Sequence, residues 1–281
     1  MRLFRTLRTH RPSYSTAEHT LELRAPRTWK EMTQEQLRYV LHLLATFQDD
    51  PVTVKTYMLC RFTGLRIGRR VLLPRGQGKI EQAYRCHFRT AWWRLSRRFL
   101  IYPWQVQSLL HQFDFIDQYD GMDVRLDTIS GCRAVDDELH GFSFGDYLNA
   151  EIYYQIAIKK HDKDAVAKLA RLLYRKKNGE PASYLHWRHL AAAEQLGTLM
   201  WFARVKSLMA QEFPYFFLQT EGLDSEAYDL IAARDAQIRA LTEGNITLEA
   251  AVMEMDCWRA LTELNQKARE TKEFKEKYGG K

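Results

Sequence analysis

The sequence predicts a mainly α protein: a helical bundle with a small β element in a basic segment and a helical hairpin at the C-terminus. The longest helical pattern runs from residue 184 to residue 217, and its apolar residues repeat at the spacing of one broad buried face. These residues are Thr198, Phe202, Val205, Met209 and Phe213. Residues 66–102 combine short apolar runs with turn residues, which is typical of strands. After residue 224 the apolar stripe narrows and polar residues predominate.

Two paired helices are predicted near the N-terminus. Thr33 and Gln36 have the spacing of a capping box, which places the start of the first helix at Thr33. Asp50 suits the cap and Pro51 the first position of a second helix, and Gly64 suits its end. We expect the two to pack as a helical hairpin.

The rest of the chain continues with three strands and several helices. The strands are predicted at residues 70–73, 80–88 and 99–102, and a helix opens at Pro103 and runs to about residue 116. Residues 117–143 show no periodicity and are expected to form a loop. Further helices are predicted at 144–160, 163–176, 225–242 and 248–277, in addition to the long one at 184–217.

These elements predict three parts: an N-terminal arm (1–30), a mainly helical core domain (31–223) with a basic β-containing insert (66–102), and a C-terminal helical hairpin (224–281). Past Leu264 the last helix is nearly all polar, so it gains little by packing on its own domain. We therefore expect the hairpin to dock on a protein partner or on a second copy of the chain. The predicted partner-binding residues are Ile238, Leu241, Leu248, Met255, Trp258 and Leu261.

Composition narrows the class of protein. A chain of 281 residues with 46% hydrophobic residues can bury a sizeable core, and it has no apolar run long enough to span a bilayer. Its N-terminus is basic but lacks the apolar region of a secretory signal. The four cysteines are far apart, which is typical of reduced thiols. We expect a cytoplasmic protein, in a bacterial host or as a virion component.

The positive charge is concentrated in one segment. Between Arg66 and Tyr102 there are ten basic residues and one acid, a local charge of +9, while the whole chain carries +7, which leaves −2 elsewhere. Such an excess attracts nucleic acid or an acidic partner, although it is also compatible with a solvated basic face. In the nucleic-acid alternative, the binding residues are Arg85, Arg89, Trp92, Trp93, Arg94, Arg97 and Arg98.

Two motifs are similar to motifs that bind or react with phosphate in other proteins. Residues 76–79 read Gly-Gln-Gly-Lys, but the positions that a phosphate-binding loop needs around them hold Leu73 and Ile80, so we predict a turn. Residues 63–66 read Thr-Gly-Leu-Arg and resemble the first arginine box of tyrosine recombinases. Leu185 stands where that family has a histidine, and Tyr215 lies in no matching context for a nucleophile. A divergent recombinase is therefore the least favoured alternative.

Other candidate ligands have ordinary structural interpretations. His186 and His189 share a helix face, but no third metal ligand stands at the required spacing. The acids at 136–138 are typical of loop caps. We predict no catalytic residue, no metal and no cofactor.

Three stretches carry a resemblance to a known group: residues 29–44 (WKEMTQEQLRYVLHLL), 198–217 and 237–270 (QIRALTEGNITLEAAVMEMDCWRALTELNQKARE). They resemble uncharacterised tail-associated proteins, similar to tail assembly chaperones, of phages and prophages from gut Bacteroidota. The resemblance is one of style and order and includes no catalytic motif. It implies a non-enzymatic role as a tail assembly factor or minor structural component, with phage tail components as partners.

Overall fold

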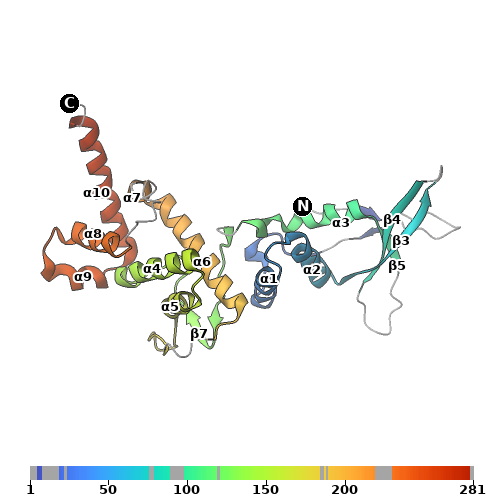
Figure 1. Ribbon diagram of the computed structural model, residues 1–281, viewed down its shortest axis with the longest axis horizontal. Coiled ribbons are helices and arrows are strands. Elements are labelled where there is room, and N and C mark those ends of the chain that lie inside the picture. The colour runs from blue at the N-terminus through green and yellow to red at the C-terminus, as the bar shows by residue number, and fades with distance from the viewer. Residues whose placement is uncertain are drawn as a thin grey trace. The chain divides into compact units, whose positions relative to one another are not determined.

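The computed structural model describes residues 5–7, 19–21, 24–75, 79–88, 98–118, 121–183, 187, 189–218 and 230–278. These residues form two compact units, unit 1 (Met1–Gln118) and unit 2 (Tyr119–Lys281). Figure 1 labels their α-helices and the strands β3, β4, β5 and β7. The prediction of a mainly α fold with a small β element is confirmed. The predicted boundaries at residues 30 and 223 lie inside these units.

Unit 1 is built on the predicted helical hairpin. Helix α1 (Gln34–Thr46) begins with the capping box of Thr33 and Gln36, and α2 (Pro51–Thr63) is capped by the side chain of Asp50. Gly64 ends α2 in the left-handed conformation at φ 71°. The short helix η1 (Trp29–Glu31) precedes the pair, and α3 (Pro103–Leu110) with η2 (His111–Asp117) completes the helical part. Its core includes Leu37, Val40, Leu41, Met58, Leu59 and Phe113.

The sheet of unit 1 has the order β3-β4-β5, with antiparallel neighbours. Its strands are β3 (Leu65–Arg75), β4 (Lys79–Phe88) and β5 (Arg98–Ile101), close to the three predicted strands. Because β5 pairs with only residues 84–87 of β4, the rest of β3 and β4 forms a two-stranded ribbon. Near the N-terminus, β1 (Arg5–Leu7) pairs with β2 (His19–Leu21).

A bulge in β3 fixes the register of this sheet. Ile67 pairs with Cys86 and Arg70 pairs with Tyr84, so Gly68 and Arg69 together face the single residue Arg85. A Cβ atom at Gly68 would lie 2.6 Å from the carbonyl oxygen of Arg85. Only glycine fits this close approach without a backbone shift.

A buried lysine joins α2 to η2. Lys55 donates hydrogen bonds of 2.6 Å to both Asp114 and Asp117, and His111 contacts Asp114 at 3.0 Å. Burial lowers the pKa of Lys55, but the bonds to the two carboxylates outweigh this effect and raise the pKa overall. The bond from Lys55, followed by that from His111, lowers the pKa of Asp114. This network therefore stabilises the charged forms of both Lys55 and Asp114.

Unit 2 contains the long helix. Its strands are β6 (Thr128–Ile129), β7 (Cys132–Ala134) and β8 (Tyr174–Arg175), and its first helices are α4 (Phe144–Lys160), α5 (Lys163–Leu173), α6 (Ala192–Glu212) and α7 (Pro214–Leu218). All five residues of the predicted stripe on α6 are buried, as expected. Three details differ from the prediction. The helix expected at 184–217 begins at Ala192 and ends at Glu212, and Phe213 separates it from α7. The loop at 117–143 contains two strands, and α5 ends at Leu173 because the next two residues pair with β7.

The C-terminal helices are α8 (Leu230–Thr242), α9 (Glu249–Glu254) and α10 (Cys257–Tyr278), with the short helix η5 (Ile246–Leu248) before α9. The prediction of a single helix at 248–277 is wrong, because the helical conformation is interrupted at Met255 and Asp256. Asp256 accepts hydrogen bonds from the backbone of Trp258 and Arg259 in the first turn of α10, and from Gly141 at 2.7 Å.

Backbone bonds extend this attachment. Phe144 donates to the carbonyl of Met255 at 2.7 Å, and Cys257 donates to the carbonyl of Phe142 at 2.8 Å. The start of α4 also packs closely on α9, since a Cβ at Gly145 would lie 2.9 Å from the end of the Met253 side chain. Hydrogen bonds and close packing therefore join residues 139–145 to the α9–α10 junction.

We expect Asp256→Ala to destabilise this junction by about 1–2 kcal/mol, the usual effect of losing a helix cap. Hydrogen exchange should become faster in residues 139–144 and 252–260 of the full chain. Glu254→Ala, on an exposed neighbour, serves as the control and should change little. Equal exchange in both variants would contradict the role of Asp256.

Gly68→Ala is expected to shift the backbone of β3 and β4 and to destabilise unit 1 by roughly 1–3 kcal/mol, as overpacking does elsewhere. Hydrogen exchange of peptides from 65–75 and 79–88 would report the change. The matched control is Arg69→Ala, at the exposed second position of the bulge. If Gly68→Ala left exchange unaltered, the close approach to Arg85 would not constrain the sheet.

The double variant Asp114→Asn/Asp117→Asn should lower the free energy of unfolding at pH 7 by about 1–3 kcal/mol, because it leaves the Lys55 ammonium buried without a counter-charge. Adding Lys55→Met should recover part of this loss. Urea unfolding of the full chain measures both effects, and a triple variant no more stable than the double would contradict the explanation.

The same network predicts a pH dependence. Because the folded pKa of Asp114 is lowered, its contribution is present above the ordinary carboxyl pKa and is lost as the pH falls through the folded value. Because the folded pKa of Lys55 is raised, its contribution is present below the ordinary lysine pKa and is lost as the pH rises through the folded value. The stability difference between wild type and the double variant should therefore shrink near pH 3.

Candidate functional site

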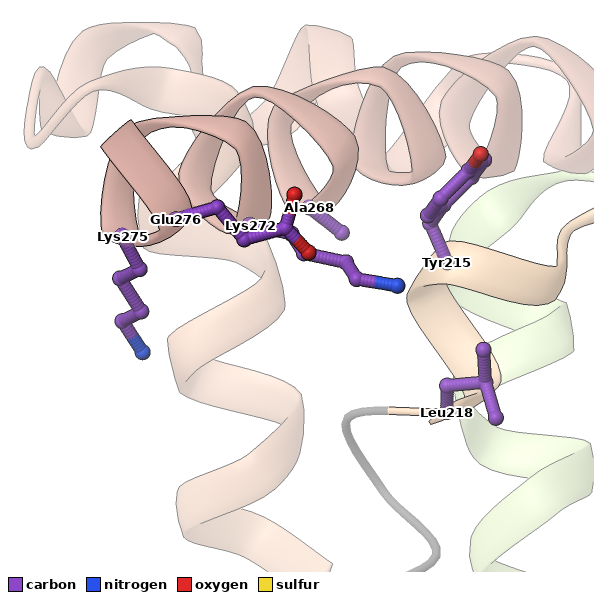
Figure 2. A pocket seen from close by; sticks show the side chains of 6 residues that line it. All are labelled: Tyr215, Leu218, Ala268, Lys272, Lys275 and Glu276. Carbon is purple, nitrogen blue, oxygen red and sulfur yellow. The ribbon is translucent and has the colours of Figure 1, made fainter. Parts of the chain in front are cut away.

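A pocket of about 530 Å³ lies between α7 and α10 in unit 2. Figure 2 shows the six side chains that line it: Tyr215, Leu218, Ala268, Lys272, Lys275 and Glu276. The four from α10 are spaced i, i+4, i+7 and i+8, so they share one helix face. The volume is within the range of pockets that hold a small ligand or a protruding side chain.

The pocket has an apolar floor and a cationic rim. Ala268 is buried, whereas Leu218 is 57% exposed. The Lys272 ammonium lies 5.7 Å from the centre of the Tyr215 ring, and the Arg269 guanidinium lies 5.8 Å from the same ring. In Figure 2, Lys272 extends from α10 toward α7 while Lys275 points away from α7. The charged part of the lining therefore has two lysines and one acid, Glu276, beside an aromatic and an aliphatic surface.

Two contacts hold α7 and the residue before it against α10. The backbone N–H of Phe216 donates to the side-chain oxygen of Asn265 on α10 at 3.0 Å. Phe213, just before α7, packs edge-on against Trp258 with ring centroids 5.4 Å apart. These contacts position Tyr215 and Leu218 opposite α10.

Beyond the buried Ala268, the last part of α10 is exposed at every position from 269 to 278. Phe274 and Tyr278 are 64% and 68% exposed, and their rings contact each other with centroids 4.8 Å apart. Large apolar side chains on a solvated helix end are typical of a surface that another molecule covers.

The six predicted partner-binding residues are divided by the structure. Ile238 and Leu261 are buried inside unit 2, so they pack within the chain and are not available to a partner. Trp258 donates a 2.7 Å hydrogen bond to the carbonyl of Glu138 and stacks on His140. Leu241 and Met255 are half-buried, and Leu248 alone is exposed, at 47%. Sequence reasoning missed the pocket, because its two walls come from helices about fifty residues apart in the chain.

The basic segment supplies a second surface, on the sheet of unit 1. Arg85 and Arg98 are exposed there, whereas Arg89, Trp92, Trp93, Arg94 and Arg97 lie outside the described residues. In register, His87 of β4 lies between Arg66 of β3 and Arg98 of β5. Arg85, two residues before His87, projects from the same face. We call these four residues the basic row.

The other candidates from the sequence have structural roles or remain unplaced. Asp136 accepts bonds from the backbone of Glu138 and His140, as expected of a loop cap. His189 is exposed, and His186 lies outside the described residues. No cluster of three or more potential metal ligands occurs in the part of the chain that the structure describes. Tyr215, considered as a nucleophile, lines the pocket instead.

The four cysteines are free thiols. Burial raises the pKa of Cys86 to about 11 and that of Cys257 to about 12, and it also raises those of Cys60 and Cys132. Thiols with raised pKa values stay protonated at neutral pH and are poor nucleophiles. Among the described helices, none is both long and apolar enough for a membrane span.

Comparison with known proteins suggests no function for this chain, so its function is inferred from the two surfaces. The sequence matches no protein-family model, no curated protein and no solved structure.

Proposed function

We propose that this chain is a non-enzymatic interaction protein whose pocket between α7 and α10 receives a side chain of a protein partner. The observation that carries the proposal is the apolar pocket with a cationic rim, beside a helix end that is exposed over its last ten residues. Side chains that could act as catalysts have structural positions instead: Asp136 caps a loop, and Cys86 and Cys257 are buried in the core.

The pocket indicates the chemistry of the partner. Ala268 and Leu218 favour an apolar side chain, while Lys272, beside the Tyr215 ring, favours an acidic group on the side of the pocket away from Glu276. The partner that fits is therefore a protein segment with an apolar anchor followed by Asp or Glu. The resemblance of the sequence implies phage tail assembly as the setting, so a tail component is the partner that we propose.

Leu218→Glu should abolish partner binding, because it places a carboxylate on the apolar floor of the pocket. The matched control is Ile246→Glu, which alters an exposed isoleucine outside the pocket (82% exposed). Both variants would be co-expressed with the proteins encoded by the genes on either side and purified by affinity tag. The proposal predicts that wild type and Ile246→Glu retain the same partner and that Leu218→Glu loses it.

Sedimentation velocity of the purified chain distinguishes a second copy from a different partner.

Equal recovery of the partner with both variants would contradict a role for the pocket. Loss with both would show that added negative charge, rather than the pocket, controls binding.

A further inference from the structure

We propose that the basic row, Arg66, Arg85, His87 and Arg98, binds the phosphate backbone of duplex DNA. This function is separate from the pocket in unit 2 and does not depend on it. The register of the sheet, the scarcity of acids among its described residues and the kind of side chains that share the face support this proposal.

The register places the charges at fixed positions. Arg66 and Arg98 each pair with His87 from opposite sides, and strands in a sheet lie about 4.8 Å apart. The Cα atoms of the two arginines are therefore about 10 Å apart, so their long side chains can reach different phosphates. The residues that alternate with the row, such as Cys86 and Phe99, are buried on the opposite face. The row shares its own face with the buried Ala83 and the half-buried Leu100, and Arg66, Arg85 and Arg98 are exposed on that face.

Nothing in the described part of the sheet neutralises these cations. The ion pairs of the described residues do not involve Arg66, Arg85 or Arg98. Glu81 is the one acid among the described residues of β3, β4 and β5, and it lies four residues from Arg85 on the same face, about 14 Å along the strand. Like charges on neighbouring strands repel, and an anionic partner relieves this repulsion.

Duplex DNA fits better than the other anionic partners. Its phosphates form a dense, regular array of negative charge, which suits cations held at fixed spacing. Proteins that bind single strands stack bases on aromatic rings, whereas the described residues that share this face include no Phe, Tyr or Trp. The ribbon of β3 and β4 that continues past β5 also has the form that enters a major groove.

The test is fluorescence anisotropy of a labelled 20-base-pair duplex with the full chain, titrated from about 50 to 200 mM salt. The wild type should bind at the low end with a steep salt dependence. The exposed double variant Arg66→Gln/Arg98→Gln should bind roughly tenfold more weakly per lost arginine and reduce the slope of log K against log salt by about 2.

Two controls make the comparison specific. Lys159→Gln/Lys160→Gln removes the same charge from an exposed site in unit 2, and Arg70→Gln removes a charge from the opposite face of the sheet. Both should bind like wild type. Equal weakening by a control and the test variant would overturn the proposal, as would the absence of duplex binding at 50 mM salt.

Competitors identify the anion. Tighter binding of the single strand than of the duplex, or equal binding of poly-glutamate, would also overturn the proposal. Unchanged circular dichroism of the double variant would confirm that weaker binding does not reflect unfolding.

Discussion

The arrangement of unit 2 depends on the hydrogen bonds around Asp256. Its carboxylate accepts one N–H from the loop before α4 and two from the first turn of α10, so a single side chain both starts a helix and attaches it. The direction of α10 follows from this attachment. Asn265, two turns further on, then holds α7 and completes the pocket. The exposed end of α10 continues directly from this attached part of the helix.

In unit 1 the equivalent constraint is the close approach of Gly68 to Arg85. In a sheet, a shift of one residue moves every side chain to the other face. The bulge absorbs one extra residue of β3, so that the half-buried Ile67 stays beside the buried Cys86 while Arg66 is exposed on the opposite face. The arrangement of the basic row therefore depends on Gly68, which carries no charge.

The sequence predicted elements whose signals are local. Capping residues located α1 and α2, and apolar periodicity identified the buried face of α6. It did not predict the break at Asp256, because a single aspartate does not by itself end an apolar periodicity and its third partner, Gly141, is distant in the chain. Simple alternation would place Arg66 and Arg70 on one face, but the bulge between them puts them on opposite faces, and the sequence does not show this bulge. Sites built from distant segments require knowledge of the pairing.

The two surfaces differ in the kind of recognition that they can provide. The pocket combines a shaped apolar floor with a few charges, so its selectivity depends on the fit of one side chain and should vary little with salt. The basic row has charge without a cavity, so its binding is governed by counterion release and carries little information about sequence. Under the two proposals, the pocket would hold one partner specifically while the basic row associates with DNA in general. That combination suits an assembly factor that must recognise one protein close to a nucleic acid.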